Sequence, residues 1–415
     1  MVQNDGEKDA SSVRISRREL LEKGVAAGLS LGFVSTFPLQ VRRSAAEESS
    51  AQVSGEDKTR VVREGPIAEL IRKHMENTQT PGIAVGLYDG NHEPSGQIFP
   101  QGYANFESKR PVSPELVFEI GSVTKVFTST LLGYRPEILD EPLAEHLPIK
   151  GRNPELRRVR VVNLATHTSG FPPNVEGPGR DGGPYLFHDR LPPVDSAILK
   201  LWRNWAPTHP LNGYCRTCGV GTCWNYSNVG FVTLGFVVAG DHYNQVLKEK
   251  ITGPLSMKGT SANPPEGSPL ADGYVFKNGE RHPATGRDVD LKASALDMIS
   301  WIKAQVQPYE VEDQALGAAI VQTHQKRFFA SQQCPQSQPI HFDMGLGWQI
   351  HPFLDTGLTI AIKDGGTFLG GQSCWVGFIE SKKLGVAVLT NMIGGKSSPA
   401  ELGLQILRQR LDNGE

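Results

Sequence analysis

The hydrophobic pattern at the start of the folded region predicts one helix followed by two strands. Apolar residues recur at helical spacing over residues 66–75, and the Pro81-Gly82 pair then breaks the chain. The apolar run at residues 83–88 predicts a strand, and residues 97–103 predict a second one. This part of the chain is therefore expected to open with an α/β layer.

Helical spacing dominates the middle of the chain, and strand-like patterns return near its end. Helices are predicted at residues 122–132, 194–205, 226–239 and 243–251, whereas residues 171–193 and 206–223 are rich in Gly and Pro and are expected to be irregular. Strands are predicted at residues 345–350, 358–362, 374–379 and 384–389. A capping box from Ser398 to Glu401 begins a last helix, which is expected to run to about Leu411.

This order of elements predicts an α/β (α+β) fold. Segments from both ends of the chain would form one antiparallel sheet flanked by helices, with a mostly helical region at residues 133–300 inserted between them. A single large domain is expected over residues 63–412. The chain has 415 residues, of which 38% are hydrophobic, so it can bury a sizeable core. Its net charge of −2 gives no reason to expect a nucleic-acid partner.

The N-terminus carries the features of an export signal. Arg17 and Arg18 precede a weakly apolar stretch at residues 24–37 that is rich in Gly, Ala and Ser. We therefore expect a twin-arginine signal over residues 1–46, a solvated linker over residues 47–62, and a periplasmic or extracellular protein. No clean cleavage site is present near residues 45–46, so an uncleaved signal that anchors the protein to the membrane is the alternative.

Ser122 and Lys125 form an S-x-x-K sequence at the start of a predicted helix. Residues three apart on a helix share one face, so the lysine amine can lie beside the serine oxygen and help to remove its proton. The helix N-terminus also favours a developing alkoxide, and the N–H of Ser122 can point at an oxyanion. Taken alone, Ser122 could equally be an ordinary N-cap. A second S-x-x-K at residues 300–303 is interpreted as a surface pair within a helix.

Two further motifs offer groups that suit catalysis. Tyr226 can act as a base only if its pKa falls from about 10 towards 8, which requires about 2.7 kcal/mol from neighbours such as ammonium groups. Asn228 follows two residues later and offers an amide to a substrate carbonyl. Lys363 ends an apolar strand and can hold a carboxylate. Gly365 and Gly366 let a substrate lie against the strand edge and can supply an oxyanion N–H.

Both motifs have a rival elsewhere in the chain. Residues 103–105 repeat the Tyr-x-Asn pattern at a strand end, where a turn is the simpler interpretation. Residues 277–279 repeat Lys-x-Gly, but the pair Asn278-Gly279 predicts a hairpin turn. The motifs therefore gain their weight from their order and combination.

In this order and on these elements, the three motifs resemble the class C β-lactamase family, which includes D-Ala-D-Ala carboxypeptidases, low-molecular-weight penicillin-binding proteins and related esterases. The resemblance covers roughly residues 64–412. Further stretches that look like the family lie at residues 118–125, 164–170, 253–258 and 345–348. The resemblance implies the serine β-lactamase/DD-peptidase fold and a catalytic domain within residues 63–412.

The resemblance also implies a role for each site residue. Ser122 would be the nucleophile that forms an acyl-enzyme, with Lys125 and Tyr226 sharing the base and acid roles. The substrate-binding residues would be Asn228, Lys363, Gly365 and Gly366, and the N–H groups of Ser122 and Gly366 would form the oxyanion hole. No metal or organic cofactor is needed. The expected partner is a small molecule or peptide, namely a cell-wall peptide, a β-lactam or an ester.

Two residues beside these motifs affect the expected activity. Asp364 stands where the family often has Thr, and an anion next to Lys363 is expected to weaken its hold on a carboxylate, which makes β-lactam hydrolysis the less expected activity. His167 is predicted to lie in a Thr-Ser-Gly turn, where backbone groups satisfy it, rather than to act in catalysis.

The cysteines predict a crosslinked loop before Tyr226. Cys215, Cys218 and Cys223 crowd this loop, and an exported protein favours a disulfide within it or to Cys334. Zinc is the alternative for the loop cysteines, and Cys374 is expected to be a buried spectator.

The sequence thus predicts a serine hydrolase that acts as a D-Ala-D-Ala carboxypeptidase or a related amidase. An esterase or a true β-lactamase would use the same residues. A penicillin-binding sensor that acylates on Ser122 and then stalls is the alternative from another functional class.

Overall fold

A sheet built from both ends of the chain organises the fold. The computed structural model describes residues 59–149, 153–174, 196–206, 219–288, 290–333, 339–353, 356–396 and 398–412. Within these residues, nine strands form one sheet in the order β1-β3-β2-β13-β12-β11-β10-β9, with β4 beside β3. Neighbouring strands are antiparallel, except that β1 runs parallel to β3. The predicted α+β architecture is therefore confirmed.

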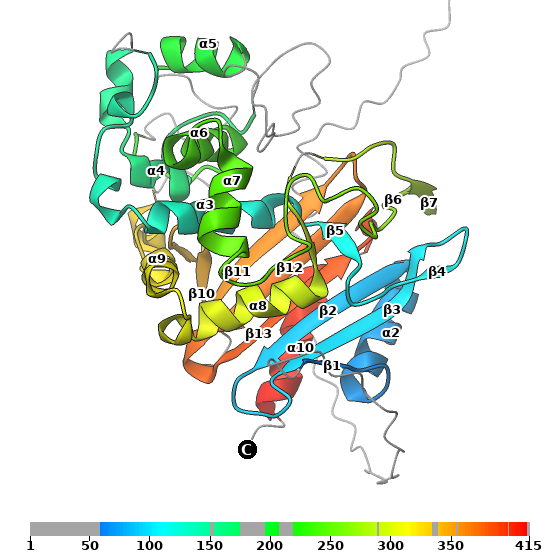
Figure 1. The fold of residues 1–415 in the computed structure, drawn as a ribbon. Helices are drawn as coiled ribbons and strands as arrows, with labels where there is room; N and C mark the ends of the chain where they lie inside the picture. Colours follow the sequence, from blue (N-terminus) through cyan, green and yellow to red (C-terminus); the bar gives the residue numbers. More distant parts are fainter. Residues whose placement is uncertain are drawn as a thin grey trace, which may run out of the picture. The chain divides into compact units, whose positions relative to one another are not determined.

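Strands that are distant in sequence meet at the centre of this sheet (Figure 1). The N-terminal strands are β1 (Thr59–Val61), β2 (Gly82–Asp89), β3 (Gly96–Asn105) and β4 (Arg110–Pro111). The C-terminal strands are β9 (Asp343–Met344), β10 (Gln349–Phe353), β11 (Leu358–Thr367), β12 (Gln372–Ile379) and β13 (Leu384–Thr390). Strands β2 and β13 pair directly and are buried along their whole length. Burial on both faces explains why their sequences are continuously apolar rather than alternating.

Helices cover both faces of the sheet. Helices α2 (Pro66–Thr78) and α10 (Pro399–Asp412) pack on one face, where their apolar side chains join those of β2 and β13 in one core cluster. Helix α8 (Ala295–Val306) packs on the other face against β2 and β13 (Figure 1). The sheet is therefore the middle layer of three, as alternating side chains on buried strands require.

Most of the remaining elements form a mainly helical region beside the sheet, whereas η9 is the turn between β12 and β13. Its helices are α3 (Thr124–Gly133), α4 (Val161–Ala165), α5 (Ser196–Asn204), α6 (Asn228–Ala239), α7 (Tyr243–Leu247), the π-helix η5 (Lys248–Thr252) and α9 (Gln314–His324). Short 3₁₀ turns are η1 (Gly121–Val123), η2 (Pro136–Ile138), η3 (Leu143–Glu145), η4 (Pro154–Arg158), η6 (Pro308–Glu310), η7 (Ala330–Gln332) and η9 (Glu380–Lys382). Small strands are β5 (Val117–Glu119), β6 (Tyr274–Lys277), β7 (Glu280–Pro283), β8 (Lys292–Ser294) and β14 (Met392–Gly394).

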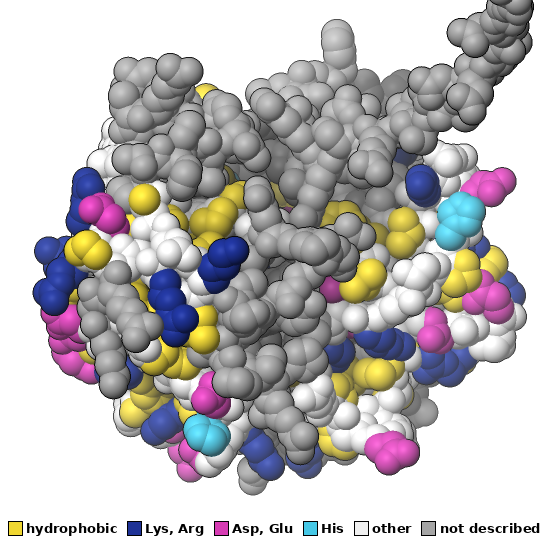
Figure 2. Space-filling view, turned by 90° about the horizontal axis from the view of Figure 1, so that it is seen from above, with side chains coloured by type: hydrophobic (Ala, Val, Ile, Leu, Met, Phe, Trp, Pro, Cys, Tyr) yellow, Lys and Arg dark blue, Asp and Glu magenta, His cyan; other side chains and the backbone are white. Residues whose placement is uncertain are grey.

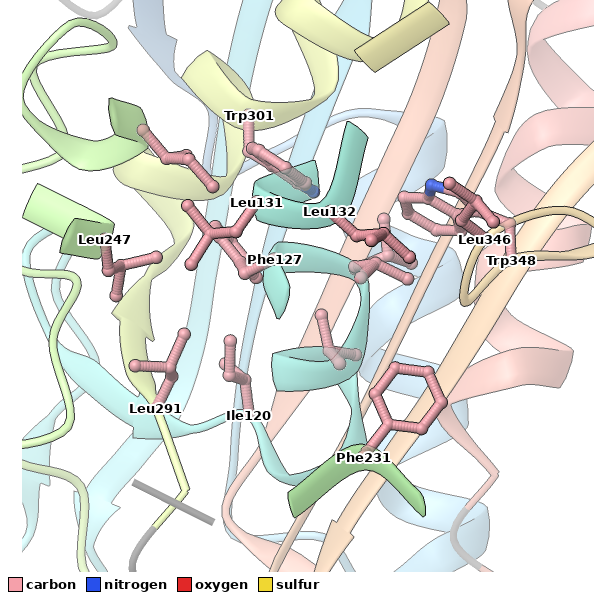
Figure 3. Close-up of a cluster of buried hydrophobic side chains, with 14 of the residues drawn as sticks. Ile120, Phe127, Leu131, Leu132, Phe231, Leu247, Leu291, Trp301, Leu346 and Trp348 are labelled. Atoms are coloured by element: carbon pink, nitrogen blue, oxygen red, sulfur yellow. The ribbon is translucent and has the colours of Figure 1, made fainter. Parts of the chain in front are cut away.

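Helix α3 runs through the centre of the larger hydrophobic core. Its side chains Phe127, Leu131 and Leu132 meet aromatic and aliphatic groups from several other elements (Figure 3). Phe127 stacks on Trp301 of α8 with a ring-centroid distance of 4.1 Å and an interplanar angle of 18°. Since all of α3 is buried, the residues at its N-terminal end are held on a rigid support.

Three sequence predictions differ from the structure. Residues 59–61 of the predicted linker form β1, because the edge of β3 offers hydrogen-bond partners that no local pattern reveals. Residues 345–348 form the turn between β9 and β10 instead of a strand, since Gly347 has a φ of +77°. The region at residues 133–300 also contains the strands β6, β7 and β8. In contrast, the hairpin at Asn278-Gly279 is confirmed, with φ values of 55° and 84°.

Several predictions lie outside the described residues. These include the export signal, the linker up to residue 58, and most of the two irregular loops. Among the described residues, no helix has the length and apolar character needed to cross a membrane. On the face shown in Figure 2, Lys and Arg side chains are interspersed with Asp and Glu side chains, so this face carries no single sign of charge.

Candidate active site

Ser122 lies in the 3₁₀ turn η1, directly before α3. Gly121 enters this turn with a φ of +49°, a left-handed conformation that suits glycine. Ser122 is only partly buried, whereas Lys125 is fully buried one turn later on α3. The Nζ of Lys125 lies 2.8 Å from the Oγ of Ser122 and donates a hydrogen bond to it. The predicted contact between the serine hydroxyl and the lysine amine is therefore present.

Tyr226 reaches the same serine from the start of α6. Its hydroxyl donates to the Oγ of Ser122 at 2.6 Å. Ser227 caps α6 by accepting a hydrogen bond from the N–H of Gly230 at 2.9 Å, which fixes the chain just after the tyrosine. The helix begins at residue 228 rather than 226, and the tyrosine itself remains outside the helix.

His167 supports Tyr226 and makes no contact with Ser122 among the described hydrogen bonds. Its Nδ1 accepts from the N–H of Ser227 at 3.1 Å, and its ring centroid lies 4.4 Å from that of Tyr226. With a φ of +57°, it occupies the predicted turn. Burial and the positive charges of Lys363 and Lys125 hold its pKa well below 6.5, so the ring is neutral at pH 7.

The third motif approaches the nucleophile from β11. Lys363 is 3% exposed, and its Nζ lies 5.0 Å from the ring centroid of Tyr226. A Cβ on Gly365 would lie 2.1 Å from the carbonyl oxygen of Ile120. A Cβ on Gly121 would lie 2.6 Å from the nitrogen of Gly366. The glycines thus let β11 lie directly against the turn that carries Ser122, which brings the main chain of Gly366 beside the nucleophile.

Asp364 does not neutralise Lys363 directly. Neighbouring residues on a strand point to opposite faces, and Lys363 is buried whereas Asp364 is exposed. Asp364 is paired in register with Trp375, which packs in the cluster beneath α10. Among the described residues, no ion pair within 4 Å joins the two side chains. Asp364 can therefore weaken the hold of Lys363 on a substrate carboxylate only through its charge at longer range.

The electrostatics favour Lys125 as the group that accepts a proton. Burial lowers the pKa of Lys125 to about 8, and the negative charge of Asp290 opposes this shift. Burial raises the pKa of Tyr226, which outweighs the opposing effects of Lys363 and of the hydrogen bond with Ser122. The tyrosine does not show the lowered pKa that a phenolate base requires, because desolvation of the phenolate exceeds the gain from the nearby ammonium.

The other sequence-derived candidates are placed less directly. Asn228 lies at the first position of α6, and its amide donates to Asn174 at 2.9 Å. Its role towards a substrate stays a prediction. Asp290 is a buried acidic residue beside the site that the sequence analysis missed, and no spacing pattern around it could have revealed it.

The cysteine predictions are only partly covered by the structure. Cys374 is a buried free thiol, as expected. Cys223 is buried and is not a free thiol. Three cysteines (Cys215, Cys218 and Cys334) lie outside the described residues, so the pairing stays a prediction. In the part of the chain that the structure describes, no group of three or more His, Cys, Asp or Glu side chains could hold a metal ion.

Comparison with known proteins shows the family of this chain. The family model described as "Beta-lactamase" matches residues 67–409. The chain belongs to the beta-lactamase family. It is 25% identical to a beta-lactamase of Pseudomonas fluorescens over 368 residues, covering 76% of this chain and 90% of the relative. It is also 25% identical to a beta-lactamase of Escherichia coli (strain K12) over 368 residues, covering 80% and 90%.

The fold is also found in a solved structure. The structure is similar to that of a class C beta-lactamase, with a TM-score of 0.66 and 20% sequence identity. The match covers 82% of this chain and 94% of the other. Membership in the beta-lactamase family, together with this fold, makes the protein a serine hydrolase of that family.

Proposed function

We propose that this hydrolase cleaves cell-wall peptides that end in D-Ala-D-Ala. The observation that carries the proposal is the buried ammonium of Lys363, which lies 5.0 Å from the ring centroid of Tyr226, whose hydroxyl is bonded to Ser122. A buried cation is costly unless an anion meets it. The terminal carboxylate of such a peptide is a suitable anion, one residue away from the bond to be broken.

The arrangement supports a reaction through an acyl-enzyme. Ser122 attacks the carbonyl carbon, and its proton passes to the neutral amine of Lys125, 2.8 Å away. The N–H groups of Ser122 and Gly366 receive the developing oxyanion. As the C–N bond breaks, Tyr226 gives its proton to the leaving amine and regains one from Lys125. Water then hydrolyses the ester by the reverse sequence and frees the serine.

Hydrolysis of β-lactams is a second candidate function on the same residues. It is favoured by the names of the relatives, which are beta-lactamases at 24–26% identity. A penicillin also presents a carboxylate beside its reactive amide, so the same ammonium would receive it. The exposed position of Asp364, on the opposite strand face, removes the direct obstacle expected from the sequence.

We also propose that the protein is exported by the twin-arginine route and acts in the periplasm or outside the cell. The support is the arginine pair before a weakly apolar stretch, together with a cell-wall substrate that lies beyond the cytoplasmic membrane. The loop disulfide belongs to the same proposal, since it requires an oxidising compartment.

One experiment separates these functions. Purified protein is given a peptide ending in D-Ala-D-Ala, the same peptide with a C-terminal amide, a fluorescent penicillin and a neutral ester, with Ser122→Ala as the control. We expect release of D-Ala from the acid peptide and at least about 100-fold slower cleavage of the amidated one, since the latter leaves a buried charge unpaired. If the amidated peptide and the neutral ester were cleaved as fast as the acid peptide, the peptidase proposal would be refuted and an esterase indicated.

The penicillin arm distinguishes the β-lactam outcomes. Rapid disappearance of the drug, without cleavage of the peptide, would show a β-lactamase. Stable label on Ser122 with slow peptide turnover would show a sensor. Label on the wild-type protein that is absent from Ser122→Ala, together with release of D-Ala by the wild-type protein, supports the peptidase.

A further inference from the structure

A buried acidic residue, Asp290, acts electrostatically on the lysine of the candidate active site. Asp290 is 3% exposed, and its Oδ1 has no hydrogen-bond partner among the described residues. An unpartnered carboxylate oxygen in a protein interior is costly. A positive charge nearby would stabilise this carboxylate.

The main chain places Asp290 against the catalytic turn. Its neighbour Leu291 accepts a hydrogen bond from the N–H of Ile120 at 2.9 Å and donates one to the hydroxyl of Thr124 at 3.1 Å. Ile120 directly precedes the turn of Ser122, and Thr124 follows this turn as the first residue of the helix that carries Lys125. The segment with Asp290 is thus bound to both ends of the turn that carries the nucleophile.

The nearest lysine in sequence, Lys292, acts on Asp290 through its charge but donates no hydrogen bond to its carboxylate among the described residues. Lys292 donates to the carbonyl oxygens of Ala262, Asp288 and Asp290 at 3.1, 2.9 and 3.0 Å. An ammonium group has three protons, so these bonds use all of its donors. Lys292 therefore holds the main chain of the segment in place and leaves the carboxylate of Asp290 without a bonded cation.

We propose that Asp290 is a positioning residue for acylation: its buried carboxylate faces Lys125 from behind and sets the pH above which this amine can take the proton of Ser122. The two charges do not form an ion pair within 4 Å in the described part of the chain, so Asp290 acts through its field in a dry interior. The inference rests on the proposed acyl-enzyme at Ser122 but not on the identity of the substrate.

The surroundings of the pair define the expected pH dependence. The groups that face Lys125 are Asp290, Tyr226, Lys363 and His167, and those that face Asp290 are Lys125, Lys292, Asp288 and Glu119. Burial raises the pKa of Asp290 to about 7 and lowers that of Lys125 to about 8. Near pH 8 the carboxylate is ionised and stabilises the ammonium. Removing it should lower the pKa of Lys125 further and move the neutral amine to lower pH.

The test follows modification of Ser122 by a fluorophosphonate. The Oγ–P bond forms as the P–F bond breaks, fluoride leaves, and the hydroxyl proton passes to Lys125. We expect the wild-type rate to rise with pH through a midpoint near 8. In Asp290→Asn this midpoint should move down by about one pH unit or more, since an opposite charge at short range shifts a pKa by about that amount. At a pH between the two midpoints, where Asp290 of wild type is ionised, the variant should react at a larger fraction of its own plateau rate than wild type does.

The control is Asp288→Asn, which makes the same charge change two residues away. The carboxylate of Asp288 accepts from the N–H of Leu369 at 3.2 Å, which ties it to the turn between β11 and β12. Its midpoint should stay that of wild type. If Asp290→Asn does not fold, Asp290→Ser removes the same charge in a smaller volume, and folding is checked by thermal melting.

The outcomes are distinct. A lower plateau with an unmoved midpoint in the folded Asp290 variants would show a purely structural role and overturn the inference alone. An equal shift in Asp288→Asn would also overturn it, since any nearby charge would then suffice. Absence of labelling in wild type at every pH would refute the activated serine and with it the proposed function.

Discussion

Replacing Gly121 by alanine tests how the active site is assembled. Gly121 has a φ of +49°, and a left-handed conformation costs other residues roughly 1–2 kcal/mol. The added Cβ would also lie 2.6 Å from the nitrogen and 2.7 Å from the oxygen of Gly366. Since ordinary carbon contacts lie at about 3.5–4.0 Å, β11 has to retreat by roughly 1 Å.

That retreat acts directly on the proposed oxyanion hole. Displacing a catalytic group by about 1 Å can cost about 100-fold in rate. We therefore expect Gly121→Ala to lower kcat/KM by about 100-fold, together with a loss of stability of roughly 1–2 kcal/mol. The assay is the rate of acylation of Ser122 by a fluorescent penicillin or a fluorophosphonate, measured with the melting temperature of the same sample.

Gly267→Ala is the matched control. Gly267 also has a positive φ, +84°, but a Cβ there would meet no atom within 4 Å. The control should lose a similar amount of stability, seen as a drop of a few degrees in Tm, and keep its acylation rate. Should Gly121→Ala acylate within about threefold of wild type, close approach of β11 to the nucleophile turn would not be what forms the site.

Three further predictions follow from the charges and the core. Lys363→Met should lower kcat/KM for the D-Ala-D-Ala peptide by at least about 30-fold and leave kcat/KM for the neutral ester within about threefold. The control Lys382→Met, at an exposed lysine, should leave kcat/KM for both substrates unchanged. Parallel losses on both substrates in Lys363→Met would argue against carboxylate binding. Asp364→Asn should change kcat/KM for the peptide by less than about threefold, because this side chain lies on the opposite face of β11; a tenfold gain would show that it does oppose Lys363. Phe127→Ala should destabilise the protein by about 3–5 kcal/mol in denaturant unfolding, since it removes a ring stacked 4.1 Å from Trp301, and a loss below about 1 kcal/mol would contradict the tight packing of α3.

Several features of the fold could be read from local patterns. The spacing of Ser122 and Lys125 predicted that both side chains lie on one face, and their 2.8 Å contact agrees, although Ser122 lies in the turn η1 directly before the helix. The apolar runs gave β2, β12 and β13 to within about two residues, because strands buried on both faces need continuous apolar sequence. The Asn278-Gly279 hairpin was predictable for a similar reason, since only certain residues accept two successive positive φ values.

Other features depend on contacts between distant segments. Strand β1 forms because the edge of β3 is nearby. Residues 345–348 form a turn rather than a strand, and the apolar side chains of Leu346 and Trp348 enter the core from this turn. The lowering of the Lys125 pKa and the raising of the Tyr226 pKa both follow from burial, which no local motif specifies.

The sequence by itself determined the candidate reactive groups and their local spacing: a serine and a lysine three residues apart, a tyrosine two residues before an asparagine, and a lysine directly after an apolar run. Only the tertiary structure decided how these groups act together. Strand pairing put Asp364 on the face opposite to Lys363, and glycine contacts brought β11 against the nucleophile turn. Packing of a segment more than 160 residues away bound Leu291, the neighbour of Asp290, to the first residue of α3. The physical reason is that periodicity is encoded by neighbours in the chain, whereas burial and electrostatic fields are properties of neighbours in space.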